Sequence, residues 1–244
     1  MESSSPRADR ARRVAHVLRG QVLAGSFPQG LLPDERELVA QFSVSRNTVR
    51  EALGLLSDEG LVERRRGVGT VVTGRVHEHP LDELAGLAEV LQRHGSVVNE
   101  IRTAGRVRPP AAVARRLHVP EDGEVVHLER LRRLDGVPLS LDTTYLLPRI
   151  GDPLLELERG TLEHRDVFRL LETVSGVRLG HAEITVQALA ADPATRAVLA
   201  VPERSGAVLA LERLTYLADG SPADLEYIRI RGDRLMLRAR MERP

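Results

Sequence analysis

The residues of this chain with the most recognisable chemistry are arginines spaced through the segment from Leu31 to Val72. Arg46 and Arg50 stand one helical turn apart, and Arg65 and Arg66 precede a glycine-containing turn. A guanidinium group donates paired hydrogen bonds to phosphate oxygens and to the O6 and N7 atoms of guanine. Arginines at these spacings therefore point to DNA as a partner, provided that the backbone presents them on one surface.

The same segment predicts the elements that would present these arginines. Asp34 and Glu37 have the spacing of a capping box, which indicates a short helix directly after Asp34. Ser45 is a second N-cap and opens a helix from Arg46 to about Ser57, in which apolar residues recur at helical spacing. Residues 61–64 and 70–72 indicate two strands joined by a basic, glycine-containing turn. Helix, turn, helix and hairpin in this order predict a winged helix-turn-helix.

The motif LLPDERELVAQFSVSRNTVREALGLLSDEGLVERRRGVGTVV resembles that of the GntR family of bacterial transcription regulators. The resemblance implies DNA contacts at positions in both helices and the wing, namely Arg36, Ser45, Arg46, Thr48, Arg50 and Gly69. Position adds three more candidates, because the N-terminal end of a recognition helix and the wing both approach DNA: Asn47, Arg65 and Arg66. The alternative for any single arginine is a solvated helix face without a partner.

Composition sets the broad class of the protein. With 244 residues the chain is long enough for two domains, and the absence of cysteine excludes disulfides and thiolate metal sites. All 35 basic side chains are arginine, and 35 acidic ones balance them. Residues 1–76 hold 12 Arg against 9 Asp and Glu, whereas residues 77–244 hold 23 against 26. A basic module joined to an acidic one fits a DNA reader with a separate sensor, and we expect it in the cytoplasm.

Polar stretches between the predicted elements indicate the domain boundaries. Residues 1–9 are polar and are expected to be disordered, and residues 10–74 are expected to form the DNA-binding domain, beginning with a helix over 10–24. Residues 75–80 are predicted to be a linker, and residues 81–244 a second domain that opens with an amphipathic helix over 81–94. His77 and His79 flank a glutamate in this linker, but alternate residues of a mobile segment make a poor metal site, so no metal is expected.

The second domain contains an internal repeat. One copy runs from Leu117 to Pro138 and the other from Leu199 to Pro222. Each follows a short helix opened by proline, contains a strand that ends at an Asp-Gly turn, and continues into a further strand. Two such copies predict one pseudo-symmetric antiparallel sheet with helices packed on it.

This second half resembles the UTRA effector-binding domain of the HutC subfamily, which shares its fold with chorismate lyase. The matching stretches are 129–132, 135–138, 141–145 and 231–234. The resemblance implies an α+β protein with an N-terminal winged helix-turn-helix domain and a C-terminal chorismate-lyase-like antiparallel sheet with packed helices. Glycine-containing hairpins argue against the all-helical sensor domain found elsewhere in the family.

Strand alternation and the resemblance together predict an effector pocket. Arg130 and Arg132 share one strand face, and Ser140, Asp142 and Thr144 share a face of the next strand. Further candidates are carboxylates, namely Asp166, Asp224 and Glu226. In sugar-phosphate-sensing relatives the arginines hold the phosphate, and a serine stands at the position of Asp166. A carboxylate beside a phosphate is costly, so the prediction is a hydroxyl-rich or cationic effector. The competing interpretation is a set of ordinary surface ion pairs.

The predicted function is a ligand-responsive repressor. We expect a homodimer that binds a palindromic DNA operator, is released by a small-molecule effector, and uses no cofactor or membrane. The rival hypothesis is a lyase-like enzyme on the sensor fold, but no catalytic residue or catalytic motif is found in the sequence. An architectural DNA-binding protein without a ligand is disfavoured by the large sensor-like half.

Overall fold

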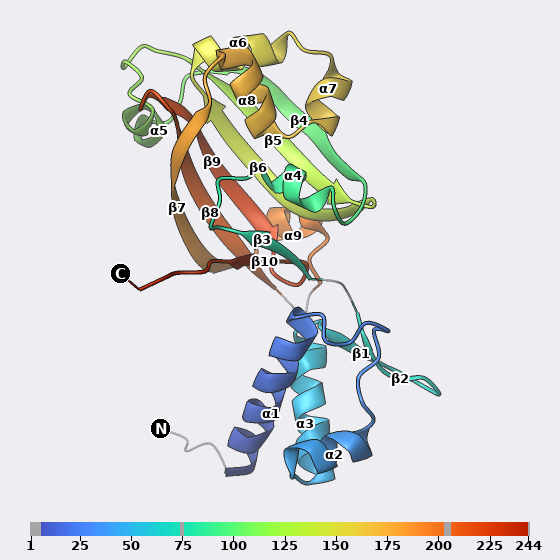
Figure 1. Ribbon diagram of the computed structural model, residues 1–244. Helices are drawn as coiled ribbons and strands as arrows, with labels where there is room; N and C mark the ends of the chain where they lie inside the picture. The colour runs from blue at the N-terminus through green and yellow to red at the C-terminus, as the bar shows by residue number, and fades with distance from the viewer. Residues whose placement is uncertain (1–5, 74–75, 203–205, 244) are drawn as a thin grey trace. The chain divides into compact units, whose positions relative to one another are not determined.

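The computed structural model describes residues 6–73, 76–202 and 206–243 (Figure 1). These form two compact units, one that ends at Val76 and also includes Pro202, and one built from residues 77–201 and 206–243. The N-terminal unit contains α1 (Pro6–Leu23), α2 (Glu35–Phe42), α3 (Arg46–Asp58), β1 (Val62–Arg65) and β2 (Gly69–Val72). Strands β1 and β2 form an antiparallel hairpin, and Leu31 adds a single bridge to Val71. The predicted winged helix-turn-helix is therefore confirmed.

Local signals in the sequence begin both predicted helices at the expected residues. The Asp34 side chain accepts hydrogen bonds from the backbone N–H groups of Arg36 and Glu37, while the Glu37 carboxylate accepts one from the backbone N–H of Asp34. Ser45 caps α3 by accepting a hydrogen bond from the Thr48 backbone N–H. The three helices then bury one apolar core, which includes Leu18, Leu38, Val49, Ala52 and Leu56.

The prediction of disorder through residue 9 is wrong for residues 6–9, and residues 1–5 lie outside the described part of the chain. Helix α1 begins at Pro6, a residue type favoured at the first helical position, and Asp9 in its first turn suits the helix dipole. Arg7 forms an ion pair with Glu51 of α3 at 3.4 Å. These interactions extend the helix by a turn beyond its apolar stripe, which is why the stripe alone did not predict it.

The C-terminal unit is built on a six-stranded antiparallel sheet in the order β4-β5-β6-β9-β8-β7. The strands are β4 (Val97–Val107), β5 (Val125–Leu134), β6 (Val137–Leu146), β7 (Leu179–Ala190), β8 (Ala207–Leu217) and β9 (Pro222–Arg231). Each half of this order contains one copy of the repeat, and the copies meet where β6 pairs with β9. Tight turns at Asp135-Gly136 and Asp219-Gly220 connect β5 to β6 and β8 to β9. The predicted pseudo-symmetric sheet is confirmed.

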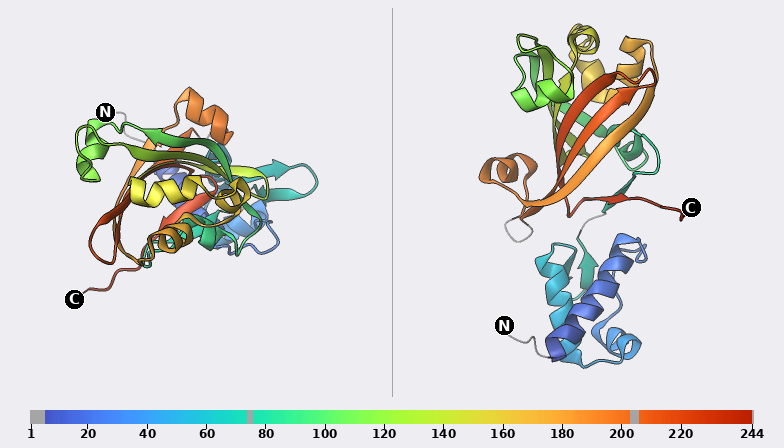
Figure 2. Two further views of the ribbon diagram at one scale, coloured as in Figure 1. Left: turned by 90° about the horizontal axis from the view of Figure 1, so that it is seen from above. Right: turned by 90° about the vertical axis from the view of Figure 1, so that its left-hand side faces the viewer.

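Helices cover both faces of this sheet (Figure 2). The helices are α4 (Leu87–Leu91), α5 (Ala111–Arg116), α6 (Pro148–Leu155), α7 (Arg159–His164), α8 (Val167–Ser175) and α9 (Pro193–Leu199). Apolar side chains of α4 and of α6 to α8 pack on one face, which we call the inner face, and those of α5 and α9 pack on the other. None of the helices in the described residues is long and apolar enough to cross a bilayer.

Two predictions at the junction between the units are wrong. Most of the predicted linker, His77–Pro80, is strand β3, which pairs in parallel with β10 (Leu235–Arg238) from the end of the chain. The helix predicted over 81–94 is shorter and corresponds to α4, because Leu81 hydrogen-bonds to Arg238 at the end of β10 and Asp82 to Arg240 just beyond it. Both errors have one cause, a pairing partner more than a hundred residues away. Residues 74–75 of the linker prediction lie outside the described residues.

Candidate functional site

The N-terminal end of α3 presents polar side chains to solvent. Ser45, Arg46, Asn47 and Arg50 are exposed, as a DNA-contacting surface requires. Thr48 differs from this group: it is only 4% exposed, and its hydroxyl shares a 2.8 Å hydrogen bond with that of Ser45. Its role in the structure is to complete the N-cap, and its burial leaves little of the side chain to reach DNA.

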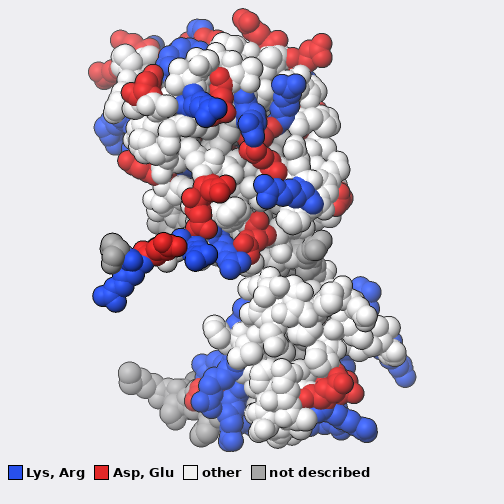
Figure 3. Space-filling model, viewed as in Figure 1, with Lys and Arg blue, Asp and Glu red and all other residues white. Residues whose placement is uncertain are grey.

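Three arginines from two elements converge on a single carboxylate, Glu35 in the first turn of α2. Arg46 and Arg50 of α3 lie 3.5 Å and 3.1 Å from it, and Arg64 of β1 lies 3.1 Å from it. Figure 3 shows arginine side chains beside acidic ones at the surface of this unit. The arginine side chains are 52–72% exposed, so each pair is weak and a phosphate can replace the carboxylate. Arg64 was not among the sequence-predicted contacts.

The wing extends this basic surface. Arg65 and Arg66 at its turn are exposed, as is Arg36 on α2. Gly67 and Gly69 have φ angles of 78° and 123°, a region in which side chains other than glycine are strained. The two glycines therefore permit a tight turn that projects basic residues away from the core. The structure thus places the predicted DNA contacts, Thr48 excepted, on exposed positions of α2, α3 and the wing.

The predicted effector residues lie together on the inner face of the sheet, and they are buried. Arg130 and Arg132 come from β5, Asp142 from β6, and Asp224 and Glu226 from β9; each is at most 2% exposed. The competing interpretation as surface ion pairs is therefore wrong for these residues. Buried charges need close partners because their desolvation is costly.

Arg132 is the centre of the first group of contacts. Its Nη2 atom lies 2.6 Å from Asp142 Oδ2, and its Nη1 and Nε atoms donate to Ser140 Oγ at 3.0 Å and Asn99 Oδ1 at 2.8 Å. Ser140 in turn donates to Asp142 Oδ1 at 2.7 Å. Every nitrogen of this guanidinium therefore has a partner within the protein.

Glu226 is the centre of the second group, because it bridges two arginines. Oε1 accepts a hydrogen bond from Arg130 Nη2 at 3.1 Å, and Oε2 accepts from Nε of Arg213 at 3.2 Å and from its Nη2. Burial raises the pKa of Glu226, but Arg213 and Arg130 outweigh that effect and lower it to about 2. Arg213 also lies beneath the ring of Phe168, with the guanidinium carbon 4.2 Å from the ring centroid.

Asp224 has the opposite environment. Burial and the neighbouring Glu226 raise the pKa of its carboxyl group to about 7. The charge of Arg213, the Thr215 hydroxyl opposite it on β8 and the charge of Arg130 lower this pKa without outweighing burial. Within the described part of the chain, neither Asp224 oxygen nor the Thr215 hydroxyl makes a hydrogen bond of good geometry. The inner face therefore holds a fully paired glutamate and an unpaired aspartate on the same strand.

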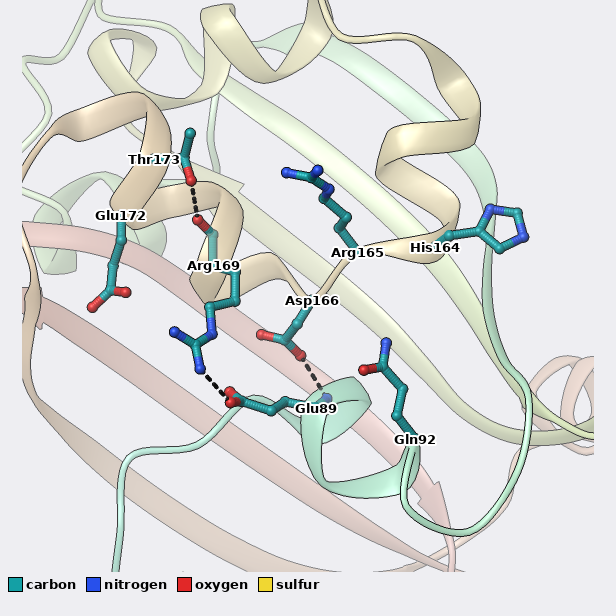
Figure 4. A pocket seen from close by; sticks show the side chains of 8 residues that line it. All are labelled: Glu89, Gln92, His164, Arg165, Asp166, Arg169, Glu172 and Thr173. Atoms are coloured by element: carbon teal, nitrogen blue, oxygen red, sulfur yellow. Dashed lines mark hydrogen bonds and ion pairs between the residues drawn. The ribbon is translucent and has the colours of Figure 1, made fainter.

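Asp166 joins two helices beside this cluster (Figure 4). Its Oδ1 accepts a hydrogen bond from the Phe168 backbone N–H at 2.9 Å, and its Oδ2 accepts one from the Glu89 backbone N–H at 3.2 Å. Arg169 adds an ion pair to the Glu89 side chain at 2.6 Å. A groove of about 670 Å³ lies between α4 and α8 along these residues. One oxygen of Asp166 thus caps α8, and the other ties α8 to α4.

Gly86 is required for this arrangement. A Cβ atom on it would lie 1.9 Å from Asp166 Oδ1, closer than any real contact. Glycine at 86 and aspartate at 166 therefore depend on each other.

His79 is a buried neighbour of the cluster on strand β3. It is 4% exposed, and burial together with the positive charges of Arg213 and Arg132 lowers its pKa to about 4. The imidazole is therefore neutral near pH 7. His79 thus places one side chain of β3, the first strand of this unit, within the electrostatic influence of Arg213 and Arg132.

Comparisons with known proteins match both units. Residues 10–72 match the family described as bacterial regulatory proteins, gntR family, and residues 92–236 match the UTRA domain. The HTH-type transcriptional regulator Rv0792c of Mycobacterium tuberculosis is 30% identical over 224 residues, which is 91% of this chain and 82% of that protein. The probable transcriptional regulator PhnF of Escherichia coli is 30% identical over 219 residues, 89% of this chain and 86% of that protein. The chain belongs to the GntR family.

Solved structures agree with this assignment. The crystal structure of PhnF from Mycobacterium smegmatis matches with a TM-score of 0.66 and 27% sequence identity over 94% of this chain and 99% of that one. The GntR-family chain described here is therefore a transcription regulator with a DNA-binding domain and a ligand-binding UTRA domain, as its sequence predicted. Its relatives and its fold are those of regulators rather than enzymes.

Sequence reasoning missed one central residue of the GntR-family chain's inner face. Arg213 was not predicted, although the repeat aligns the Glu-Arg-Leu of 212–214 with that of 129–131 and so places Arg213 at the position of Arg130. Asn99 was missed because β4 precedes the repeat unit that was recognised. An alignment of the two copies on each other would have found Arg213, whereas no local signal marks Asn99.

Proposed function

We propose that this protein is a repressor that binds a palindromic operator as a homodimer and leaves it when a small effector binds to the inner face of the UTRA sheet. As a regulator of transcription it would act in the cytoplasm, where bacterial DNA lies. The observation that carries the proposal is the contrast between exposed arginines around Glu35 and a buried ionic cluster in a separate unit.

The exposed arginines support specific DNA binding. Arg46 and Arg50 project from the recognition helix, and Arg64 to Arg66 lie on the wing. Contacts from a recognition helix to base edges and from a wing to the backbone fix both sequence and register. Contacts from the recognition helix support readout of the operator sequence, and contacts from the wing to phosphates support a salt-dependent affinity.

Symmetry and relatives support the homodimer and the repressor role. A single winged domain reads one half-site, and two-fold operators mirror two-fold proteins. NagR of Bacillus subtilis, 25% identical over 227 residues, is named a transcriptional repressor. We further propose that UTRA domains hold the dimer together, so a fragment of residues 1–76 should sediment mainly as a monomer and bind the operator weakly.

The buried cluster supports an effector without a phosphate group. Arg130 and Arg132 already have carboxylate partners in Glu226 and Asp142. Asp166 adds a further negative charge where sugar-phosphate-sensing relatives have a neutral hydroxyl. An incoming phosphate would therefore have to displace carboxylates that are already paired, at a cost of several kcal/mol.

An effector releases DNA only if it binds the DNA-incompetent arrangement more tightly than the competent one. The route we propose runs through strand β3. His79 couples the cluster to β3, and the chain from β2 of the wing to β3 passes through only residues 73–76. A rearrangement of the cluster on effector binding would shift β3 and thereby the attachment of the DNA-binding unit.

One set of measurements tests the proposal. Fluorescence anisotropy with DNA from upstream of the protein's own gene should show saturable binding, and footprinting should protect two half-sites about 10 bp apart. Asp142→Ala should leave operator binding intact while weakening release by the effector. Protection of a single half-site, or release by glucosamine-6-phosphate at micromolar concentrations, would contradict the proposal. Turnover of a small molecule by the purified protein would favour the enzyme hypothesis instead.

A further inference from the structure

The two copies of the repeat place equivalent residues opposite each other on the inner face. In the first copy Arg130 lies opposite Asp142, and in the second Arg213 lies opposite Glu226. Each position thus pairs an arginine on the first strand of the hairpin with a carboxylate on the second. The two copies carry the same chemistry at this position, so a difference at the next position along the strands would be specific to one copy.

At the next position the copies differ. Arg132 lies opposite Ser140 in the first copy, whereas Thr215 lies opposite Asp224 in the second. The Arg132 guanidinium fills its position and contacts Ser140, Asp142 and Asn99. The second copy has exchanged the cation for a short hydroxyl and the hydroxyl for a carboxylate. The negative charge is present there, but its arginine is not.

This exchange leaves unpaired groups inside the protein. Asp224 and Thr215 are both fully buried, and among the described residues neither Asp224 oxygen nor the Thr215 hydroxyl makes a hydrogen bond of good geometry. The Arg213 guanidinium donates hydrogen bonds to Glu226, and its charge and that of Arg130 reach Asp224 only electrostatically. Burial disfavours the charged form of Asp224 and raises its pKa to about 7, so the group ionises readily near pH 7 only if a cation from outside the chain completes the site.

We propose that the effector carries a positively charged nitrogen group, an ammonium or an amidinium, which binds between Asp224 and Thr215. There it takes the place that the Arg132 guanidinium holds in the other copy. This inference rests on the proposed function in one respect, the inner face being the effector site.

The charges of the inner face agree with a cationic ligand. Three buried arginines face three carboxylates of the sheet, and Asp166 adds a fourth carboxylate beside them. His79 contributes no positive charge, since its pKa is lowered to about 4 by burial and by Arg213 and Arg132. One added cation balances the cluster. It would also keep Asp224 ionised, although burial and Glu226 raise its pKa to about 7.

The groove beside helix α8 offers the effector a route toward the inner face of the sheet. Phe168 at the start of α8 lies over Arg213, and Asp166 two residues earlier lines the groove between α4 and α8. The groove therefore lies beside the part of the sheet where the second copy of the repeat is covered. Opening it requires the Asp166 and Arg169 contacts to Glu89 to break.

Thermal unfolding of the full chain with matched probes tests the inference. Ethanolamine and ethylene glycol differ by one ammonium group, and inorganic phosphate serves as the anionic probe, all at constant ionic strength. We expect ethanolamine alone to raise the melting temperature in a saturable way. Asp224→Asn should weaken that binding about tenfold or more, since it removes a charge-assisted hydrogen bond. The matched control Asp122→Asn, an exposed carboxylate, should behave as wild type.

Thr215→Arg is the complementary variant. An arginine at this position restores the pair found in the first copy, so it should raise the melting temperature without any probe and abolish the response to ethanolamine. If this variant does not fold, Asp224→Asn decides alone. A response to ethanolamine that survives in Asp224→Asn, or a response to ethylene glycol or phosphate in its place, overturns the inference.

Operator binding by the same preparations separates this inference from the proposed function. If the wild-type protein did not bind the operator, the repressor role would be contradicted, whereas the result with ethanolamine would be unchanged. A phosphate response with intact operator binding would leave the repressor role standing and overturn the cationic effector.

Discussion

Arginine–carboxylate pairs around Glu35 in the DNA-binding unit are open to solvent, whereas those on the inner face of the UTRA sheet are buried. Around Glu35 the arginine side chains are 52–72% exposed, whereas those of Arg130 and Arg132 are 2% exposed. An exposed pair contributes about 0–1 kcal/mol, so the arginine exchanges its carboxylate for a phosphate at little cost. A buried pair loses several kcal/mol per ion if it is broken, so it rearranges only when something replaces the lost partner. Under the proposed function, the same two residue types would read DNA in one unit and sense the effector in the other.

The largest effect is expected from a substitution in the buried ionic cluster of the UTRA unit. Glu226→Gln removes the charge that bridges Arg130 and Arg213, so Arg213 loses its hydrogen-bonded carboxylate and Arg130 keeps only Asp142 at 3.9 Å. We expect the free energy of unfolding to fall by about 3–5 kcal/mol, measured by urea denaturation of the full chain. The control is Glu129→Gln on β5, whose side chain is 28% exposed and pairs with Arg102. It should change stability by less than about 1 kcal/mol, and equal losses in the two variants would contradict the distinction.

Two buried groups make the stability of the UTRA unit depend on pH in opposite directions. Burial and Glu226 raise the pKa of Asp224 to about 7. Between its ordinary value of about 3.9 and this value, the folded state holds a proton that the unfolded state releases, so stability falls as pH rises. Burial, Arg213 and Arg132 lower the pKa of His79 to about 4. Between that value and its ordinary value of about 6.5, the unfolded state binds the extra proton, so stability rises with pH.

These contributions, each up to about 1.4 kcal/mol per pH unit, largely cancel between pH 4 and 6.5 in the wild-type protein. Asp224→Asn should therefore become more stable relative to wild type as pH rises through this window. His79→Gln should show the reverse and lose stability relative to wild type up to pH 7. Urea denaturation at several pH values checks both variants. Parallel profiles for all three proteins would show that neither group titrates as the buried environment requires.

Among the exposed arginines of the DNA-binding unit, we expect substitutions in the recognition helix α3 to reduce operator affinity most. Arg50→Ala removes a guanidinium that lies off the apolar stripe of α3, so the fold is retained while a DNA contact is lost. Operator affinity should fall by about 1–3 kcal/mol, the worth of a good base contact. Arg46→Ala should act in the same direction, and a loss of phosphate contact would also reduce the salt dependence of binding. Fluorescence anisotropy at fixed salt measures the effect, and wild-type affinity in either variant would return that arginine to a merely solvated role.

The accuracy of the sequence analysis follows the distance over which each signal acts. Caps at Asp34 and Ser45, the wing glycines and the two Asp-Gly turns are local, and each begins or ends an element where it was predicted. The repeat predicted the pseudo-symmetric sheet because its two copies carry the same turns. Strand β3 was taken for a linker, since its pairing partner β10 lies at the other end of the chain.

The site shows the same limit. Alternation along strands predicted which side chains share the inner face, and the structure brings Arg130, Arg132, Asp142 and Glu226 together. Strand alternation could not show that Glu226 is fully paired while Asp224 is not, because that difference depends on Arg213 and Thr215 on a neighbouring strand. Nor does any sequence signal show that one residue, Glu35, pairs with three arginines from two elements.

The smallest expected effect, and the sharpest test of the exposed half, is Glu35→Gln. The substitution keeps the shape of the side chain and removes the charge that competes with DNA phosphates for Arg46, Arg50 and Arg64. Loss of an acid from the first turn of α2 should cost about 0.3–1 kcal/mol in stability. Affinity for DNA should nevertheless rise a few-fold at low salt, and the gain should shrink as ionic strength screens the charges.

Glu37→Gln on the same helix is the matched control, because Glu37 accepts a hydrogen bond from the Asp34 backbone and glutamine preserves that contact. This control should leave DNA affinity close to that of wild type. Salt titrations of both variants with operator and with unrelated DNA measure the effect. If Glu35→Gln binds DNA more weakly than wild type, Glu35 orients the three arginines toward the duplex instead of competing with it, and the exposed pairs are then structural in the way the buried ones are.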